Sequence, residues 1–206
     1  WSQKQVQSPF ACDHFAMVYD QSKGAVILFG GQAESMVPNH ATWAWDGTAW
    51  TSLSNTGPSS RAHFGFAYDP NHAQILLYGG YTGSVFDDFW AWKDNAWQEL
   101  NVAGPGTLSH VGMAYDANLN ALVIFGGAST ASSFKSLSNT TWVLTDGVWS
   151  ELTLENAPSI RGLPAMAYHP ESKTILLYGG FDPSGNELDD TWEWDGSQWN
   201  CLLNCK

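Results

Sequence analysis

Short apolar runs recur along the chain, and each one ends in a pair of glycines. The runs are 25–29, 75–78, 122–125 and 175–178, and the glycine pairs are 30–31, 79–80, 126–127 and 179–180. A run of this length without alternation is typical of a strand buried on both faces. Glycines at its end allow close approaches of backbone that a Cβ would forbid. The regular spacing of about fifty residues predicts four copies of one structural unit.

Two further patterns flank each apolar run. A short strand ending in tyrosine precedes it, at Tyr19, Tyr68, Tyr115 and Tyr168, and a tight turn rich in proline and asparagine joins the two. A loop of variable length and a tryptophan-rich hairpin follow the glycines, at 43–50, 90–97, 142–149 and 192–199. The hairpin turns carry Asp-Gly or Asp-Asn, which suit tight hairpins. Each unit therefore predicts four short strands, and no segment has a helical period.

Four-stranded sheets that repeat radially, with large aromatic residues packed between them, describe a β-propeller. A β-sandwich would not repeat the glycine and tryptophan positions in every unit, and the coil of a β-helix is much shorter than this unit. We therefore predict an all-β propeller of four four-stranded blades in a single domain. The predicted blades span about 11–53, 60–100, 107–152 and 160–203.

The units resemble the kelch family, whose hallmarks are the double glycine after an apolar strand, the paired tryptophans and the upstream tyrosine. The hairpins at 43–50 and 192–199 have the form Trp-x-Trp-Asp-Gly-x-x-Trp, which is similar to secreted bacterial kelch repeats and the central domain of galactose oxidase. This resemblance implies a propeller scaffold in an extracellular or cell-surface protein. Kelch propellers usually have six or seven blades, so four is a low number.

The two ends of the chain do not match a simple set of four blades. Residues 1–20 align without a gap on residues 50–69, so residues 1–8 are predicted to form an orphan outer strand, while the last unit already has its own fourth strand. Three explanations remain open: a fragment of a larger propeller, a small closed ring with an extra strand, or an open arc. Exposed edges of an open arc could pair with other copies in a ring or filament. The start at Trp1, without methionine, indicates a removed leader or a piece of a longer chain.

Composition narrows the classes of partner. The net charge is −12 over 206 residues, and Arg61 and Arg161 are the only arginines. Such a surface repels phosphate backbones and anionic lipid, which argues against nucleic acid and membrane partners. No apolar run approaches the roughly 20 residues that span a bilayer. We expect a protein or a glycan as ligand.

The three cysteines leave at least one thiol without an intramolecular partner. Cys201 and Cys205 are four residues apart, which is too far for a disulfide on a straight strand, so they can bridge each other only if the segment turns. A bond from Cys12 to either of them would instead join the two chain ends. Reduced cysteines without a role are the remaining possibility.

His14, His63 and His110 occupy one repeat position, at the start of the first strand, and Leu163 takes that place in the fourth unit. If the first strands line a central channel, three imidazoles there are a possible metal arrangement. The kelch resemblance implies a structural hydrogen-bonding role at this position, which we favour. We therefore predict no metal and no cofactor.

Paired carboxylates before the third strand, Asp87 with Asp88 and Asp189 with Asp190, invite an acid/base or Ca²⁺ interpretation. We favour a structural role at the entry to the strand. No Ser/His/Asp or Cys/His set has a recognisable spacing, and the copper ligands of galactose oxidase have no counterpart here. We expect the chain to be non-catalytic.

The loops after the glycine pairs (32–39, 81–88, 128–139 and 181–189) differ in every unit. Variable loops on a repeated scaffold are where binding specificity normally lies. Their aromatic residues are candidate contacts for a sugar or a protein, or alternatively fillers between blades: Tyr81, Phe86, Phe134 and Phe181. Asn139 begins an N-glycosylation sequon.

These features predict a non-catalytic binding or assembly module for protein or glycan. The alternative is a non-catalytic portion of a secreted galactose-oxidase-like or carbohydrate-active enzyme, whose chemistry would lie outside these residues.

Overall fold

The computed structural model describes residues 5–6, 9, 12–32, 40–130 and 134–205. Each of the four units forms a four-stranded antiparallel sheet, as predicted. Blade 1 contains β1 (Ala16–Asp20), β2 (Ala25–Phe29), β3 (Thr42–Trp45) and β4 (Trp50–Ser54), and blade 2 contains β5 (Gly65–Asp69), β6 (Gln74–Tyr78), β9 (Phe89–Lys93) and β10 (Ala96–Glu99). Blade 3 contains β11 (Gly112–Asp116), β12 (Ala121–Phe125), β13 (Thr141–Thr145) and β14 (Val148–Leu152), and blade 4 contains β15 (Ala165–His169), β16 (Thr174–Tyr178), β17 (Thr191–Trp194) and β18 (Trp199–Leu203).

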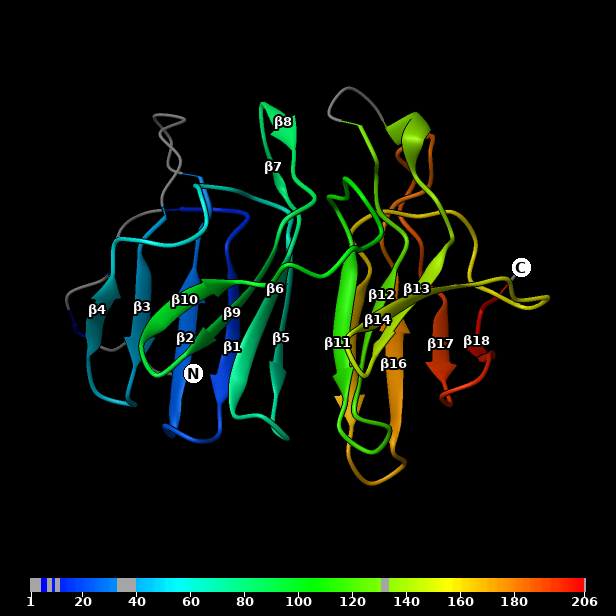
Figure 1. Cartoon of the computed structure of the whole chain (residues 1–206). Helices are drawn as coiled ribbons and strands as arrows, with labels where there is room; N and C mark the ends of the chain where they lie inside the picture. The colour runs from blue at the N-terminus through cyan, green and yellow to red at the C-terminus, as the bar shows by residue number, and fades with distance from the viewer. Residues whose placement is uncertain (1–4, 7–8, 10–11, 33–39, 131–133, 206) are drawn as a thin grey trace.

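Two small elements lie outside the blades. The loop of blade 2 forms a short hairpin of β7 (Tyr81–Thr82) and β8 (Ser84–Val85), and the loop of blade 3 contains the 3₁₀ helix η1 (Phe134–Ser136). Both stand at the upper end of the molecule in Figure 1. We call this the loop end, and the opposite end, with the tight turns and hairpin turns, the turn end.

The first strand of each blade lies nearest the centre of the molecule. These inner strands line one central cavity of about 630 Å³. Each contributes a large side chain at each of two levels: first Met17, Phe66, Met113 and Met166, then Tyr19, Tyr68, Tyr115 and Tyr168. The four blades therefore form a four-bladed β-propeller, with the first strand of each blade beside the central cavity.

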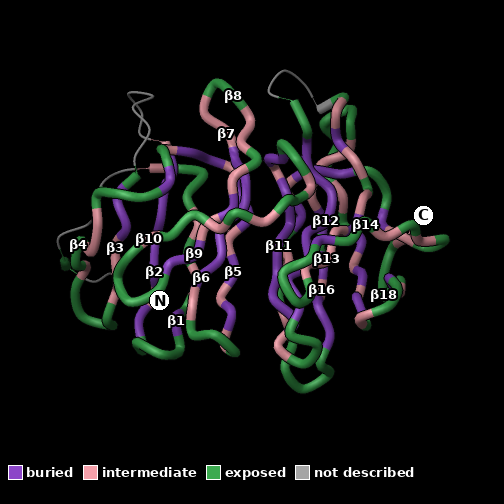
Figure 2. Tube along the Cα trace, viewed as in Figure 1, coloured by how far each residue is buried: buried purple, intermediate pink, exposed green. Residues whose placement is uncertain are grey.

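The second strands form the core of the blades and are largely buried, as their unbroken apolar runs predicted (Figure 2), except that Tyr178 at the end of β16 is exposed. Buried side chains gather in clusters that join blade 1 to blade 2, blade 2 to blade 3 and blade 3 to blade 4. Among the described residues, no such cluster joins blade 4 to blade 1. Large apolar side chains of these two terminal blades are exposed: Met17 and Tyr19, beside the central cavity, at 50% and 54%, and Tyr178 at 56%.

Buried aspartates explain the tight turns between first and second strands. The Oδ1 atom of Asp69 accepts hydrogen bonds from the backbone N–H groups of Asn71 and His72 at 3.0 and 3.1 Å. Asp20 and Asp116 make equivalent bonds in blades 1 and 3. An aspartate that binds the backbone two residues on is the reason this residue type favours turns.

Two of the sequence-based interpretations concern the chain ends. The predicted orphan strand over 1–8 falls mostly outside the described residues, and Gln5 and Val6, which are described, are exposed and not in a strand. Cys201 and Cys205 form a disulfide, with their Cα atoms 5.9 Å apart. The segment turns at Asn204, whose φ of 55° supplies the bend that this bond needs. Cys12 is half-buried and is not disulfide-bonded. The disulfide therefore lies within the C-terminal segment and does not join the two chain ends.

Candidate functional site

The glycine pairs fasten each blade to the next one at the loop end. The second glycine of each pair donates its N–H to a backbone carbonyl of the following blade: Gly31 to Arg61 at 3.0 Å, Gly80 to Leu108 at 2.8 Å, and Gly127 to Arg161 at 3.0 Å. An added Cβ at the first glycine of blade 2, Gly79, would overlap the Leu108 carbonyl oxygen. The close approach of a neighbouring chain, inferred from the sequence, is therefore the contact between blades.

The loops leave this frame from equivalent positions. Isolated β-bridges pair the first loop residue with the segment that leads into the inner strand of the same blade. The four bridges are Asp13 with Gln32, Ala62 with Tyr81, Ser109 with Ala128, and Gly162 with Phe181. Tyr81 and Phe181 thus share one repeat position, and both are half-buried. The loops beyond differ in length and sequence while their starting points coincide.

A buried arginine–aspartate pair lies beneath the loops of blades 2 and 4. The Arg61 guanidinium is fully buried and binds both carboxylate oxygens of Asp88, with Nη2 2.8 Å from Oδ2. The same guanidinium donates to the carbonyl oxygens of Ser59 and Gly79. The Trp90 indole donates to Asp88 Oδ2 at 2.7 Å. Such a bidentate, fully bonded geometry fixes both partners in place.

Blade 4 repeats this arrangement with Arg161 and Asp190, whose atoms lie 2.6 Å apart in both contacts. Burial alone would raise the pKa of each aspartate, but the hydrogen bonds and charge of the arginine, with an indole N–H, lower it below its ordinary value. Both carboxylates are therefore held as structural anions rather than as free acid/base groups.

Blades 1 and 3 lack both members of the pair. Cys12 and Leu108 stand at the arginine position, and Ala41 and Thr140 stand at the aspartate position. These ion pairs were not predicted from the sequence. The signal was present in the repeat alignment, because arginine and aspartate occur together in two units and are absent together in the other two.

The second carboxylate of each predicted pair lies elsewhere. Asp87 and Asp189 are exposed at the loop end, and the Asn204 amide donates to Asp189 Oδ2 at 3.2 Å. The structure thus separates each predicted pair: Asp88 is half-buried and Asp190 buried, each bound to an arginine, whereas Asp87 and Asp189 are exposed.

The aromatic loop candidates have different surroundings. The Phe86 ring stacks on the Arg61 guanidinium, with 4.1 Å from the ring centroid to Cζ, so it covers the buried ion pair. Phe134 begins η1, and its side chain lies outside the described part of the structure. Tyr81 and Phe181 keep part of their surfaces exposed. Asn139 of the sequon is exposed, whereas the Thr141 hydroxyl is buried and accepts a hydrogen bond from the Trp199 indole at 2.9 Å.

The three repeated histidines form a row at the loop end, one from each of blades 1 to 3. The ring centroids of His14 and His63 are 4.3 Å apart, and those of His63 and His110 are 4.1 Å apart and stacked. His63 and His110 have positive φ, and the backbone of each successive blade donates to the preceding one at this position. Leu163 continues the row in blade 4 with a hydrogen bond to the His110 carbonyl oxygen at 2.6 Å.

Burial, and to a lesser extent the neighbouring rings, lowers the pKa of two of these histidines. Burial and the neighbouring imidazoles His110 and His14 lower the pKa of His63 to about 3. Burial lowers the pKa of His110, and His14 adds to this effect. The His63 and His110 rings are stacked face to face, and the His14 ring meets His63 edge-on. Within the described residues, no group of three or more His, Cys, Asp or Glu side chains is arranged to hold a metal ion.

Comparison with known proteins agrees with this geometry. The model of the KLHDC2/KLHL20/DRC7 Kelch-repeats domain matches residues 23–202. The chain belongs to the kelch-repeat family. A solved structure titled "Structure of YjhT" has the same fold, with a TM-score of 0.74 at 14% identity, over 98% of this kelch chain and 72% of the other. No curated protein matches the sequence.

Family membership confirms the propeller prediction and bears on the kind of function. Kelch domains mediate protein interactions, so a binding module is the functional class that this kelch chain shares with its family. In the part of the chain that the structure describes, no helix is both long and apolar enough to cross a membrane.

Proposed function

We propose that this kelch propeller is a non-catalytic module that binds a protein partner with its loop end. One observation carries the proposal: four loops of different sequence start from equivalent positions on a frame made rigid by interblade hydrogen bonds. Rigid support lowers the entropic cost of presenting a binding surface, while the loops supply specificity. The buried pairs beneath two loops add to that rigidity.

The charge of the loop end favours a basic partner. Asp13, Asp87, Glu187 and Asp189 are exposed there, and the chain as a whole carries a net charge of −12. Complementary charge accelerates association and selects between partners more than it adds affinity. We therefore propose that the partner presents a lysine- or arginine-rich segment to this surface.

We also propose an extracellular or cell-surface location. The Cys201–Cys205 disulfide supports it, because such bonds persist mainly in oxidising compartments. A glycan is the second candidate ligand, supported by the partly exposed rings of Tyr81 and Phe181. Self-association is a further proposal, supported by the exposed apolar faces of blades 1 and 4.

A selection from a random peptide library tests the protein-binding proposal. Immobilised propeller should enrich basic peptides whose binding weakens as the salt concentration rises. Replacing Asp87, Glu187 and Asp189 together by lysine should weaken binding by about tenfold or more, which is the scale of lost charge complementarity. The control is Glu171→Lys, an exposed acid at the turn end. Equal binding by the triple variant and the wild type would overturn the proposal.

The glycan alternative gives a different result in a glycan array. If the ligand is a glycan, the propeller should bind it with an affinity that does not depend on salt, and Tyr81→Ala and Phe181→Ala should each abolish that binding. Enrichment of basic peptides with no retained glycan supports the protein ligand.

A further inference from the structure

The three interfaces between blades follow one pattern, and the middle interface departs from it. In blade 2 the second tryptophan of the hairpin, Trp92, packs into the interface with blade 1 and is 1% exposed. In blade 4 the equivalent Trp194 packs into the interface with blade 3 and is also 1% exposed. In blade 3 the same position is Leu144, and it faces blade 2.

The neighbours of this position have changed as well. Over Trp92, the Lys23 ammonium of blade 1 lies 5.6 Å from the ring centroid and donates to the Asn95 side chain. Over the hairpin of blade 4, Leu119 of blade 3 contacts Gly196. At the middle interface His72 stands at the position of Lys23 and Leu119, and Gly147 stands at the position of Asn95. A leucine and a glycine thus occupy positions that hold a tryptophan and an asparagine in blade 2.

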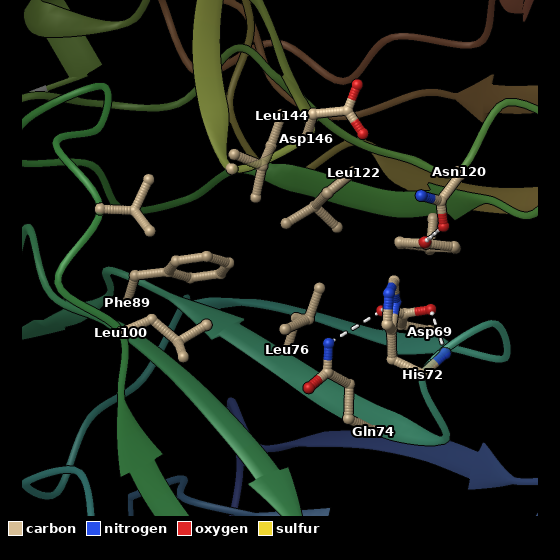
Figure 3. A pocket seen from close by; sticks show the side chains of 13 residues that line it. Asp69, His72, Gln74, Leu76, Phe89, Leu100, Asn120, Leu122, Leu144 and Asp146 are labelled. Atoms are coloured by element: carbon tan, nitrogen blue, oxygen red, sulfur yellow. Dashed lines mark hydrogen bonds and ion pairs between the residues drawn. The ribbon is translucent and has the colours of Figure 1, made fainter.

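A cavity of about 310 Å³ lies where the missing indole would be. Leu122 and Leu144 of blade 3 form one wall, and Leu76, Phe89 and Leu100 of blade 2 form the opposite wall (Figure 3). Leu76, Phe89 and Leu122 are almost fully buried. A slot with two apolar walls, one of them carrying a phenyl ring, suits a flat aromatic group.

Polar groups gather at one end of the slot. Asp69 is buried there, and its Oδ2 accepts hydrogen bonds from His72 Nδ1 at 2.7 Å and Gln74 Nε2 at 2.9 Å (Figure 3). Asn120 and Asp146 complete the polar rim. The counterparts of Gln74 are Ala25 in blade 1, Ala121 in blade 3 and Thr174 in blade 4. Two carboxylates at the rim of an acidic protein favour ligands that donate hydrogen bonds or carry positive charge.

We propose that this interblade cavity binds an aromatic ligand of about the size of indole that carries an N–H or ammonium group. The ligand would take the place of the indole side chain found in the other two interfaces, and the apolar walls would contact it as they contact that side chain. The cavity left when a buried side chain is shortened binds small aromatic molecules in other proteins when its lining is apolar. This site is separate from the loop end, because its polar rim belongs to the turn end of the blades.

Tryptamine is the probe for the test, with indole-3-acetate as a matched anion on the same ring. Tryptamine should raise the melting temperature of the propeller in a dose-dependent way, because a ligand that binds the folded state stabilises it. It should also shift the methyl NMR signals of Leu76, Leu122 and Leu144. Indole-3-acetate should bind about tenfold or more weakly because of the rim carboxylates.

The variant Leu144→Trp restores the side chain found in blades 2 and 4, and it should abolish tryptamine binding while the protein stays folded. Val148→Trp is the control, because it adds the same side chain at an exposed position of the neighbouring strand. Tryptamine binding by Leu144→Trp that equals the wild type would overturn the proposal. If Leu144→Trp does not fold, the NMR result decides, and shifts confined to Met113 and Met166 of the central cavity would equally refute it.

Discussion

At the scale of single residues, the arginine–aspartate pairs show how one blade can be used to interpret another. Arg61→Leu removes the buried cation and leaves the carboxylate of Asp88, whose side chain is 20% exposed, beside an apolar side chain. Breaking a fully buried ion pair costs about 3–5 kcal/mol, and the partial exposure of Asp88 places the expected loss at the lower end of that range. We therefore expect a large drop in the urea midpoint of unfolding for Arg61→Leu.

The double variant Arg61→Leu with Asp88→Thr copies the residues of blade 3, Leu108 and Thr140. It should recover most of the lost stability, because replacing a whole buried pair is often close to neutral. Urea unfolding of the single and double variants provides the comparison. If both are destabilised equally, the loss does not come from the stranded carboxylate.

The histidine row makes stability depend on pH. The folded-state pKa of His63 is about 3, whereas an unfolded histidine has a pKa of about 6.5. Below pH 6.5 the unfolded chain therefore binds more protons, and the stabilisation present above that pH is lost as the pH falls toward 3. We expect a drop in the free energy of unfolding between pH 7 and pH 5, of about 1 kcal/mol after solvent screening.

His63→Gln should flatten this part of the pH profile, because glutamine does not titrate. The exposed His169→Gln serves as the control and should keep the wild-type slope. Thermal unfolding at pH 5, 6 and 7 measures all three proteins. A wild-type slope in His63→Gln would contradict the assignment of the pH dependence to the stacked ring.

At the scale of the elements, the glycine pairs provide the sharpest test of how the blades are joined. Gly79 and Gly83 both have positive φ, at 63° and 73°. An added Cβ at Gly79 would meet the Leu108 carbonyl oxygen of blade 3, whereas nothing lies within 4 Å of a Cβ at Gly83. Gly83→Ala should cost about 1–2 kcal/mol from backbone strain alone.

Gly79→Ala adds steric overlap with the next blade, which typically costs about 1–3 kcal/mol more. Chemical unfolding of the two variants separates the contribution of the interface from that of backbone strain. Equal losses would mean that the two blades can move apart without cost at this point.

Elements were the level at which sequence reasoning succeeded best. The apolar runs, the glycine pairs and the tryptophan hairpins recur four times, so any one unit checks the others. The function of the glycine pair was predicted only in part, because the partner is a carbonyl group about thirty residues away along the chain. The departure at Leu144 was visible in the repeat alignment. Its consequence was not, since the cavity depends on Leu76 and Phe89 of the neighbouring blade.

The candidate site was less predictable for the same physical reason. The sequence predicted a structural role for Asp88 and Asp190 at the entry to the third strand, but it did not reveal their arginine partners, which lie 27 and 29 residues earlier in the chain. The sequence placed the three histidines at one repeat position, but only the radial arrangement of blades brings the rings into contact at about 4 Å. The repeat pattern within one blade therefore identifies these residues, but their roles depend on contacts with other parts of the fold.

At the scale of the whole molecule, one aromatic contact is repeated at all three interfaces. The tryptophan of each outer strand packs on an aromatic residue of the preceding blade: Trp97 on Phe29 at 5.1 Å between centroids, Trp149 on Tyr78 at 5.5 Å, and Trp199 on Phe125 at 5.2 Å. Two of these tryptophans also donate their indole N–H to a threonine of the preceding blade: Trp97 to Thr42 of blade 1 and Trp199 to Thr141 of blade 3.

Blade 4 has the aromatic residue of this contact but no following blade to supply the tryptophan, and blade 1 has the outer-strand tryptophan but no preceding blade to supply the aromatic residue. Tyr178 is 56% exposed, whereas its counterparts Phe29, Tyr78 and Phe125 are fully buried. Thr191 is half-buried at the place of Thr42 and Thr141, and Trp50 of blade 1 holds the outer-strand tryptophan position. Because the two halves are complementary and not identical, self-association through them is head-to-tail.

We therefore expect the average mass from light scattering to rise with protein concentration. Tyr178→Glu should keep the protein monomeric over the same range, because it places a charge in the contact that would receive Trp50 of the second copy. Val148→Glu is the control, since Val148 is 64% exposed on the outer hairpin of blade 3 and lies on neither terminal face. A concentration-independent monomeric mass for the wild type would refute self-association, and equal association by Tyr178→Glu would place it on another surface.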